Sequence, residues 1–322
     1  MNRTTTFPAW LAVLVIAVVS FCKRRTIRTR HLSIAVCVAP LLLTGSAALA
    51  TPVTSGLELW LKADSLGLSD GANVSSWLDS SSNGRAAEQG TLANQPTFHT
   101  NVVNGLPVVR FDGSLHEFAL NVAPAGARAL WTNLNIGSSG MTVMAVINPT
   151  LINSNTDASL LFGDENGMIG VNAVESNAFN DIRFFRHAAQ ALTGPHPAGF
   201  FIPEYVGSNM AASASNTKTV RMNAGALGTN TANNSVLGVG EMVSVGTDIV
   251  NNPGRPTNFS GDVAELLIYS RVLSESELNA VGVYLEGKYG LETAYVPEPA
   301  FGAAAAGCIA IAMSRYGRRR RR

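Results

Sequence analysis

The chain has 322 residues, and its 23 Lys and Arg nearly balance its 22 Asp and Glu. Six basic residues lie in 1–50 and six in 315–322, whereas residues 51–299 hold all 22 acidic residues and 11 basic ones. This middle segment carries a net charge of −11, which argues against nucleic-acid binding through phosphate contacts. The three cysteines, Cys22, Cys37 and Cys308, lie in apolar runs near the two ends, so disulfides do not hold the acidic segment together.

The first 50 residues are predicted to be a signal region. An apolar run at 9–22 precedes a predicted signal peptide at 23–50, which has a basic stretch at 23–31 and an apolar stretch at 32–43. Ala48 and Ala50 are small residues of the kind a signal peptidase reads, which predicts cleavage before Thr51. The upstream run leaves two alternatives: translation starts downstream of Met1, or a short first span precedes the signal.

Residues 51–292 are predicted to form one all-β domain. Short apolar runs rich in strand-forming residues, such as 57–61, 107–111, 141–147 and 263–269, are separated by Gly, Asn, Ser and Pro. A hairpin is expected to turn at residues 164–167. Several such strands in one domain of this size indicate a two-sheet sandwich or a jelly roll.

One helix is expected near the end of this domain. Ser274 and Glu277 have the spacing of a capping box, and Gly290 is a typical residue to follow a helix. The apolar residues between them recur at helical spacing: Leu278, Val281, Leu285 and Tyr289.

The C-terminal end has three parts. A linker at 293–299 contains Pro297, Glu298 and Pro299, residues 300–313 are apolar, and arginines fill 318–322. A helix of 14 residues would be about 21 Å long, shorter than a bilayer core of about 30 Å, but it inserts if the bilayer thins locally. We therefore expect a transmembrane sorting helix and basic tail at 300–322. The alternative is a disordered basic tail.

This order of Pro-Glu-Pro, apolar run and arginines resembles the PEP-CTERM sorting signal of Gram-negative bacteria. The resemblance implies recognition near residues 297–299 by an exosortase, a membrane-bound processing enzyme. It also implies a transient membrane anchor and export to the cell surface or the extracellular matrix.

Three further segments resemble LamG-like, concanavalin A-type jelly-roll domains. They are DGANVSSWLDSSSNG at 70–84, QPTFHTNVVNGLPVVRFDG at 95–113 and GDVAELLIYSRVLSESEL at 261–278. The resemblance implies a fold more than a function. Its motif residues have the chemistry of core and turn positions: Trp77, Asp79, Asn104, Gly105, Phe111, Asp112 and Gly113.

Candidate ligand-binding residues are few. Trp60 and Trp77 lie within apolar patterns and are expected in the sandwich core, whereas Trp131, in a stretch rich in Gly and Asn, is the better candidate for an exposed aromatic that stacks on a sugar.

A calcium site is the candidate metal site. Its candidate ligands are Asp70, Asp79 and Asp164, but no strict D-x-D-x-D loop is present, and turn chemistry explains these residues equally well.

The sequence contains no clear pattern of catalytic residues. No E-x-D-x-E pattern appears, although retaining glucanases on this fold place two glutamates and an aspartate on alternate positions of one strand. Asp262 and Glu265, three residues apart on an expected strand, should face opposite sides. His99, His116, His187 and His196 are scattered singly.

The sequence thus predicts an exported cell-surface or matrix protein with a non-catalytic glycan-binding or adhesion module. A polysaccharide hydrolase or lyase on the same fold and a structural coat protein are the alternatives. Because the domain is acidic, affinity for an acidic polysaccharide should need calcium, whereas neutral glycans should be indifferent to it.

Overall fold

The structure is a computed structural model that describes residues 51–296 with gaps at 138, 151–157, 165–166, 175–178, 187–188, 211–215, 226–228, 233–239 and 248–257. The chain divides into two compact units, Met1–Ser46 and Ala47–Arg322, and all described residues belong to the second. The signal region with Ala48 and Ala50, the Pro-Glu-Pro motif at 297–299 and the apolar run at 300–313 lie outside the described residues. Among those described, no helix is long and apolar enough to cross a membrane.

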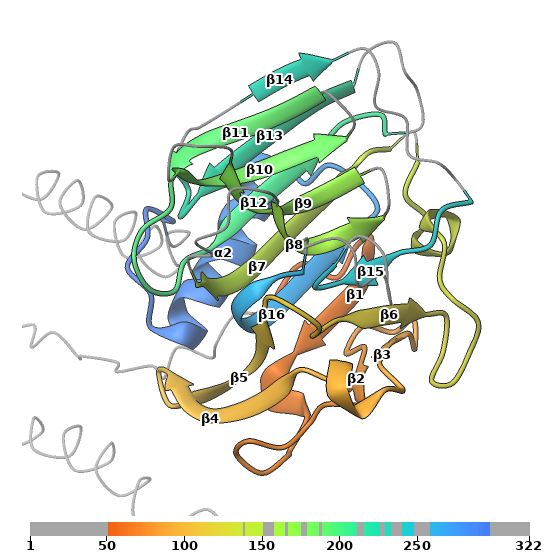
Figure 1. Ribbon diagram of the computed structural model, residues 1–322. Coiled ribbons are helices and arrows are strands. Elements are labelled where there is room, and N and C mark those ends of the chain that lie inside the picture. Colours follow the sequence, from red (N-terminus) through yellow and green to blue (C-terminus); the bar gives the residue numbers. More distant parts are fainter. Residues whose placement is uncertain are drawn as a thin grey trace, which may run out of the picture. The chain divides into compact units, whose positions relative to one another are not determined.

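Two antiparallel sheets form a sandwich, and one helix, α2 (Glu275–Tyr289), is described beside it (Figure 1). Sheet A has the strand order β14-β13-β12-β7-β16-β5-β4, with β1 also paired to β16, and sheet B has the order β11-β10-β9-β8-β15-β6-β3-β2. The strands of sheet A are β1 (Leu57–Lys62), β4 (Thr97–Val103), β5 (Leu106–Asp112), β7 (Met141–Pro149), β12 (Pro203–Gly207), β13 (Asn216–Met222), β14 (Thr229–Ala232) and β16 (Ser260–Tyr269). Those of sheet B are β2 (Ser76–Leu78), β3 (Ala86–Glu88), β6 (Phe118–Asn121), β8 (Ala158–Asp164), β9 (Gly167–Val174), β10 (Phe179–Arg186), β11 (Ala189–Pro195) and β15 (Ser244–Val245). The predicted all-β sandwich with one C-terminal helix is confirmed at this level.

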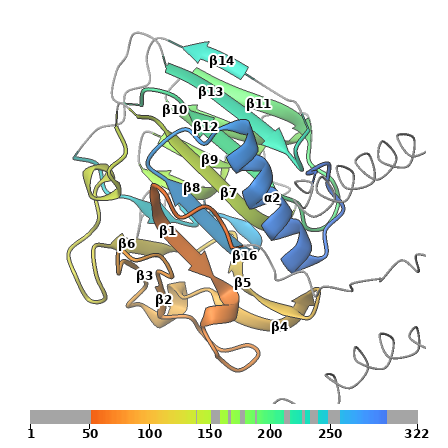
Figure 2. The same cartoon turned by 180° about the vertical axis from the view of Figure 1, so that it is seen from behind.

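The central strands of sheet A are buried on both faces. In β7, Val143 and Ala145 join the core between the sheets, whereas Met144 and Val146 join a second apolar layer on the outer face of sheet A. The helix α2 covers this outer face (Figure 2). A strand covered on both sides needs apolar residues at every position, which explains the unbroken apolar run at 141–147.

Two tight hairpins fix the register of neighbouring strands. Asn104 and Gly105 have φ angles of 47° and 76° and connect β4 to β5, the geometry that favours Asn-Gly. The strands β8 and β9 pair up to Asp164 and Gly167, as predicted for the second hairpin.

The helix α2 has the predicted ends. Ser274 is its N-cap and forms the reciprocal capping box with Glu277, and Gly290 follows it in the left-handed conformation. Its buried face includes the predicted residues Leu278, Val281, Leu285 and Tyr289. The helix packs through them on the outer apolar layer of sheet A.

The domain continues past the helix, beyond the boundary predicted at residue 292. Residues 291–296, which we term the C-terminal strap, pack against α2, β12 and the turn that follows β13. Tyr295 is buried and donates from its hydroxyl to Glu204 Oε1 at 2.6 Å, and Ala294 N donates to Asn223 O at 3.1 Å. Asn279 in α2 exchanges two hydrogen bonds with the backbone of Val296, at 2.6 and 2.9 Å. The strap is therefore part of the domain and not the start of the linker.

Candidate functional site

A polar pocket of about 590 Å³ lies on the outer face of sheet B. Trp77, Ala87 and Phe118 point into the core, so the alternating residues of β2, β3 and β6 point away from it. Strand register places Ser76, Glu88 and Ala119 opposite one another in a row across this face. The described residues that line the pocket are Ser75, Ser76, Glu88, Gln89, Gly90, Gln95, Ala119, Asn121, Gly126 and Arg128.

Glu88 presents a positioned carboxylate on one side of Ala119. Its Oε2 accepts hydrogen bonds from Asn121 Nδ2 at 2.6 Å and from Ala125 N at 2.8 Å. Its Oε1 accepts a long hydrogen bond of 3.4 Å from the Ser76 hydroxyl. Because Oε2 fixes the side chain, Oε1 is left with acceptor capacity toward the pocket.

Arg128 lies on the other side of Ala119, over the neighbouring strand β15. Its Nη2 donates to Val243 O at 3.0 Å and to Ser244 Oγ at 3.2 Å, and Ser244 pairs in register with Ala119. Its Nε is buried and has no hydrogen-bond partner among the described residues. Burial lowers the pKa of Arg128, and the charge of Glu117 opposes this shift. The pocket is therefore lined by a guanidinium whose Nη2 is held by β15 and whose Nε is closed off from solvent.

Amide side chains complete the wall. Gln89 is buried, donates to Glu117 Oε1 at 3.3 Å and accepts from Thr91 N at 2.9 Å. Gln95 donates to Gln89 O at 2.8 Å. The pocket thus combines fixed amide groups, a carboxylate acceptor and a guanidinium donor, and none of its described lining residues is aromatic. Such a set matches a ligand rich in hydroxyl groups, each of which both donates and accepts.

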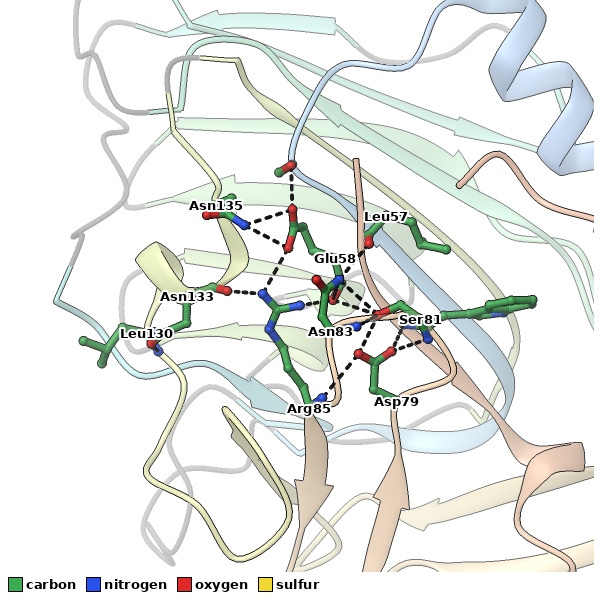
Figure 3. A network of polar contacts seen from close by, with 11 residues as sticks. Leu57, Glu58, Asp79, Ser81, Asn83, Arg85, Leu130, Asn133 and Asn135 are labelled. Carbon is green, nitrogen blue, oxygen red and sulfur yellow. Dashed lines mark hydrogen bonds and ion pairs between the residues drawn. The ribbon is translucent and has the colours of Figure 1, made fainter. Parts of the chain in front are cut away.

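A second polar cluster surrounds Glu58 and Arg85, which are both only 7% exposed (Figure 3). Arg85 Nη2 contacts Glu58 Oε2 at 3.0 Å, and Arg85 also donates to the backbone carbonyls of Glu58 and Asn133. Asn135 Nδ2 lies 3.1 Å from both Glu58 carboxylate oxygens, and Ser270 Oγ donates to Oε1 at 3.0 Å. These contacts join segments far apart in the chain, so the cluster holds the fold together and is not our candidate site.

The motif residue Asp79 belongs to this cluster. Its Oδ1 accepts from the backbone N–H groups of Trp60 and Ser81, each at 2.8 Å, and its Oδ2 accepts from Ser81 Oγ at 2.6 Å. Asn83 Nδ2 donates to Leu57 O at 2.9 Å (Figure 3). Asp79 therefore organises a turn against β1.

The other motif residues also have core or turn positions. Trp77 and Phe111 are buried in the core. Asp112 accepts from the backbone N–H groups of Ser114, Leu115 and His116. Burial would raise the pKa of Asp112, but these hydrogen bonds outweigh it and hold the pKa at about 2. Gly113 has a φ of 76°, and a Cβ there would lie 2.7 Å from Ser260 Cβ.

The expectation that Trp131 is exposed is wrong. The side chain is 1% exposed, its Nε1 donates to the buried carboxylate of Asp164, and its ring meets Phe162 edge-on. Trp131 begins the 3₁₀-helix η5 (Trp131–Leu134), which turns this side chain into the core despite its polar sequence neighbours. A ring buried in this way is not available to stack on a ligand.

The candidate calcium ligands do not come together. Asp70 accepts from Thr100 N at 2.9 Å, Asp79 organises the turn described above, and Asp164 is bound to Trp131. Within the described ranges, no three His, Cys, Asp or Glu side chains gather in a way that could hold a metal ion. These aspartates therefore do not fit a shared calcium site.

Asp262 and Glu265 share a face, contrary to the sequence prediction. A register irregularity between Val263 and Glu265 adds a residue to β16 and reverses the alternation. Asp262 pairs with Arg110 Nε at 2.6 Å. Buried Glu265 accepts from groups beneath or within α2, namely Trp60 Nε1, the Tyr284 and Tyr289 hydroxyls and Lys288 Nζ.

These contacts also place Trp60. The prediction that Trp60 lies in the sandwich core is wrong, because its side chain is partly buried in the outer apolar layer under α2. The pair Asp262 and Glu265 thus serves the packing of sheet A, on the face opposite the core.

The pocket residues Glu88, Asn121 and Arg128 are absent from the sequence predictions. The alternation in AAE at 86–88 and FALN at 118–121 indicates which side chains face outward. It does not show that β3 and β6 are neighbours, which only the strand pairing reveals.

No family profile and no curated protein matches the sequence. Among solved structures, Trypanosoma rangeli sialidase is similar, with a TM-score of 0.45 and 18% identity over 75% of this chain and 36% of the sialidase chain. Domain 4 of AbnA, a GH43 extracellular arabinanase from Geobacillus stearothermophilus solved with arabinotriose, has a TM-score of 0.46 and 14% identity over 72% of this chain and all of that one. The binding domain of botulinum neurotoxin DC has a TM-score of 0.41 and 8% identity, over 71% and 51% of the two chains. These likenesses are too distant to identify a family or a ligand.

Proposed function

We propose that the domain is a glycan-binding module and that the pocket on sheet B is its binding site. The observation that carries this proposal is the convergence of Glu88, Asn121, Arg128 and two glutamines on one pocket. The pocket volume of about 590 Å³ lies within the range that is typical of small-molecule sites. Sugar hydroxyls can donate to the acceptor oxygen that Glu88 leaves toward the pocket.

Binding is better supported than catalysis. Glycoside hydrolysis normally uses two carboxyl groups on either side of the scissile bond. Among the described lining residues, Glu88 alone supplies a carboxylate. The nearby Glu117 is buried and accepts hydrogen bonds from Gln89 and Asn94.

We further propose that the sandwich is a LamG-like jelly roll and that the protein is exported. The motif residues at core and turn positions support the first point. The signal-like residues 23–50 and the Pro-Glu-Pro, apolar and arginine order at 297–322 support the second. The intact mass of the exported form tests export and processing: it should begin at Thr51 and lack Arg318. A form that keeps the arginines would contradict processing.

The binding site is tested by filling the pocket. Ala119→Leu adds a larger side chain to the outer face without entering the core. It should abolish binding to the glycans that the wild-type protein binds on a glycan array. Leu78→Trp is the matched control, because Leu78 is exposed on β2 and does not line the pocket. Thermal melting of both variants checks the fold. Unchanged glycan binding by Ala119→Leu would show that the pocket is not the site.

A further inference from the structure

We propose that the pocket selects neutral sugars over sugars that carry a carboxylate, and that Glu88 is the selecting residue. This inference rests on the proposed glycan-binding function of the same pocket. It concerns the charge class of the ligand, which the fold does not determine.

The side chain of Glu88 is fixed in position. Asn121 and the backbone of Ala125 hold its Oε2, so the carboxylate cannot easily turn away from an incoming ligand. A sugar hydroxyl can donate to Oε1, whereas an ionised sugar carboxylate has no hydrogen to donate. Two carboxylates brought together in a partly desolvated pocket repel each other.

The positive charge of Arg128 is the strongest reason to expect an anionic ligand. That charge is already balanced by Glu117, a buried residue that directly precedes β6. Its Nη2 is engaged by Val243 and Ser244, and its Nε is shielded from solvent. Arg128 is thus engaged by the protein and is not a free cation for an anionic ligand.

The charges around the pocket are mainly negative. Glu117 acts on the charge of Arg128, Glu88 adds a carboxylate to the pocket lining, and the whole segment 51–299 carries a net charge of −11. Both the local and the overall field therefore disfavour an acidic sugar. Neutral sugars pay no such electrostatic penalty.

The test compares sugars that differ only at C6. Calorimetry of the full chain uses matched oligosaccharides of galactose and galacturonate, glucose and glucuronate, and mannose and mannuronate, without added calcium. At least one neutral member should bind, and its acidic counterpart should bind at least about tenfold more weakly, the loss expected when one charge-assisted hydrogen bond is replaced by repulsion.

The substitution Glu88→Gln removes the charge and keeps the shape. It should weaken binding of the neutral sugar and strengthen binding of its acidic counterpart, a reversal that loss of folding cannot produce. Glu292→Gln is the matched control, because Glu292 is exposed in the strap and does not line the pocket.

The outcomes separate the two proposals. Acidic sugars that bind as tightly as their neutral partners would overturn the selectivity and leave the glycan-binding function standing. A Glu88→Gln variant that shifts both affinities in the same direction would overturn the role of Glu88. Failure of every probe to bind the wild type would overturn the glycan-binding function and the selectivity with it.

Discussion

The close contact between Gly282 and Tyr295 predicts that adding a side chain at Gly282 destabilises the protein. Gly282 lies within α2, where Ala would normally stabilise a helix by about 1 kcal/mol. A Cβ built on Gly282 would overlap the ring carbons Cδ1, Cε1 and Cζ of Tyr295. The missing side chain therefore lets the strap lie directly against the helix.

Gly282→Ala should displace the strap. Releasing the buried Tyr295 ring should cost about 3 kcal/mol, by analogy with the truncation of a buried aromatic side chain. Subtracting the gain in helix propensity of about 1 kcal/mol leaves a net loss of about 2 kcal/mol in the free energy of unfolding. Urea unfolding of residues 51–296, followed by tryptophan fluorescence and circular dichroism, measures this loss.

Two controls separate the contact from the helix itself. Gly287→Ala makes the same change at an exposed position of α2 and should stabilise by about 1 kcal/mol. In a Tyr295→Ala background the overlap is absent, so Gly282→Ala should also stabilise by about 1 kcal/mol there. A Gly282→Ala variant that is as stable as Gly287→Ala in the wild-type background would refute the close packing of the strap.

Three further predictions concern ionisable groups. Arg85→Met leaves the buried Glu58 carboxylate without its charged partner and should lower the free energy of unfolding by about 3–5 kcal/mol. Arg221→Met breaks a pair with an exposed carboxylate and should cost less than about 1 kcal/mol. Equal losses in urea unfolding would contradict this difference. Burial raises the pKa of Glu204 above 4.5, so the wild type should lose stability relative to Glu204→Gln as pH rises through that raised pKa. A difference in unfolding free energy between the two proteins that does not change with pH would contradict this prediction. The Arg271 guanidinium and the N-cap serine lower the pKa of Glu277 to about 2, so stability present above pH 4.5 should fade as pH falls toward 2, and Glu277→Gln should flatten this acid limb of the stability profile.

The sequence predicted the parts of the fold that depend on local chemistry. The capping box of Ser274 and Glu277, the Asn104–Gly105 turn and the buried run at 141–147 each carry a signal within a few residues. Predictions of which way a side chain faces failed where long-range contacts determine its position. Trp131 is buried because Asp164 and Phe162 come from a different hairpin, and Asp262 and Glu265 share a face because β16 contains an irregularity.

The candidate site could not be predicted from the sequence for the same reason. Glu88 and Asn121 are 33 residues apart and meet only because β3 pairs with β6. Arg128 reaches the pocket from the loop that follows β6, where its neighbours give no indication of a ligand. Outward-facing polar residues are ordinary on a sheet, so their identity alone does not mark a site.

Glycan binding on the outer face of sheet B can be mapped residue by residue. Backbone amide chemical shifts of residues 51–296 are recorded by NMR during titration with a glycan that the wild-type protein binds on an array. We expect the largest shift changes at Glu88, Gln89, Asn121 and Arg128, with little change around Glu58 and Arg85. Saturable shifts confined to sheet A, α2 or the Glu58–Arg85 cluster, with the pocket residues unmoved, would contradict it.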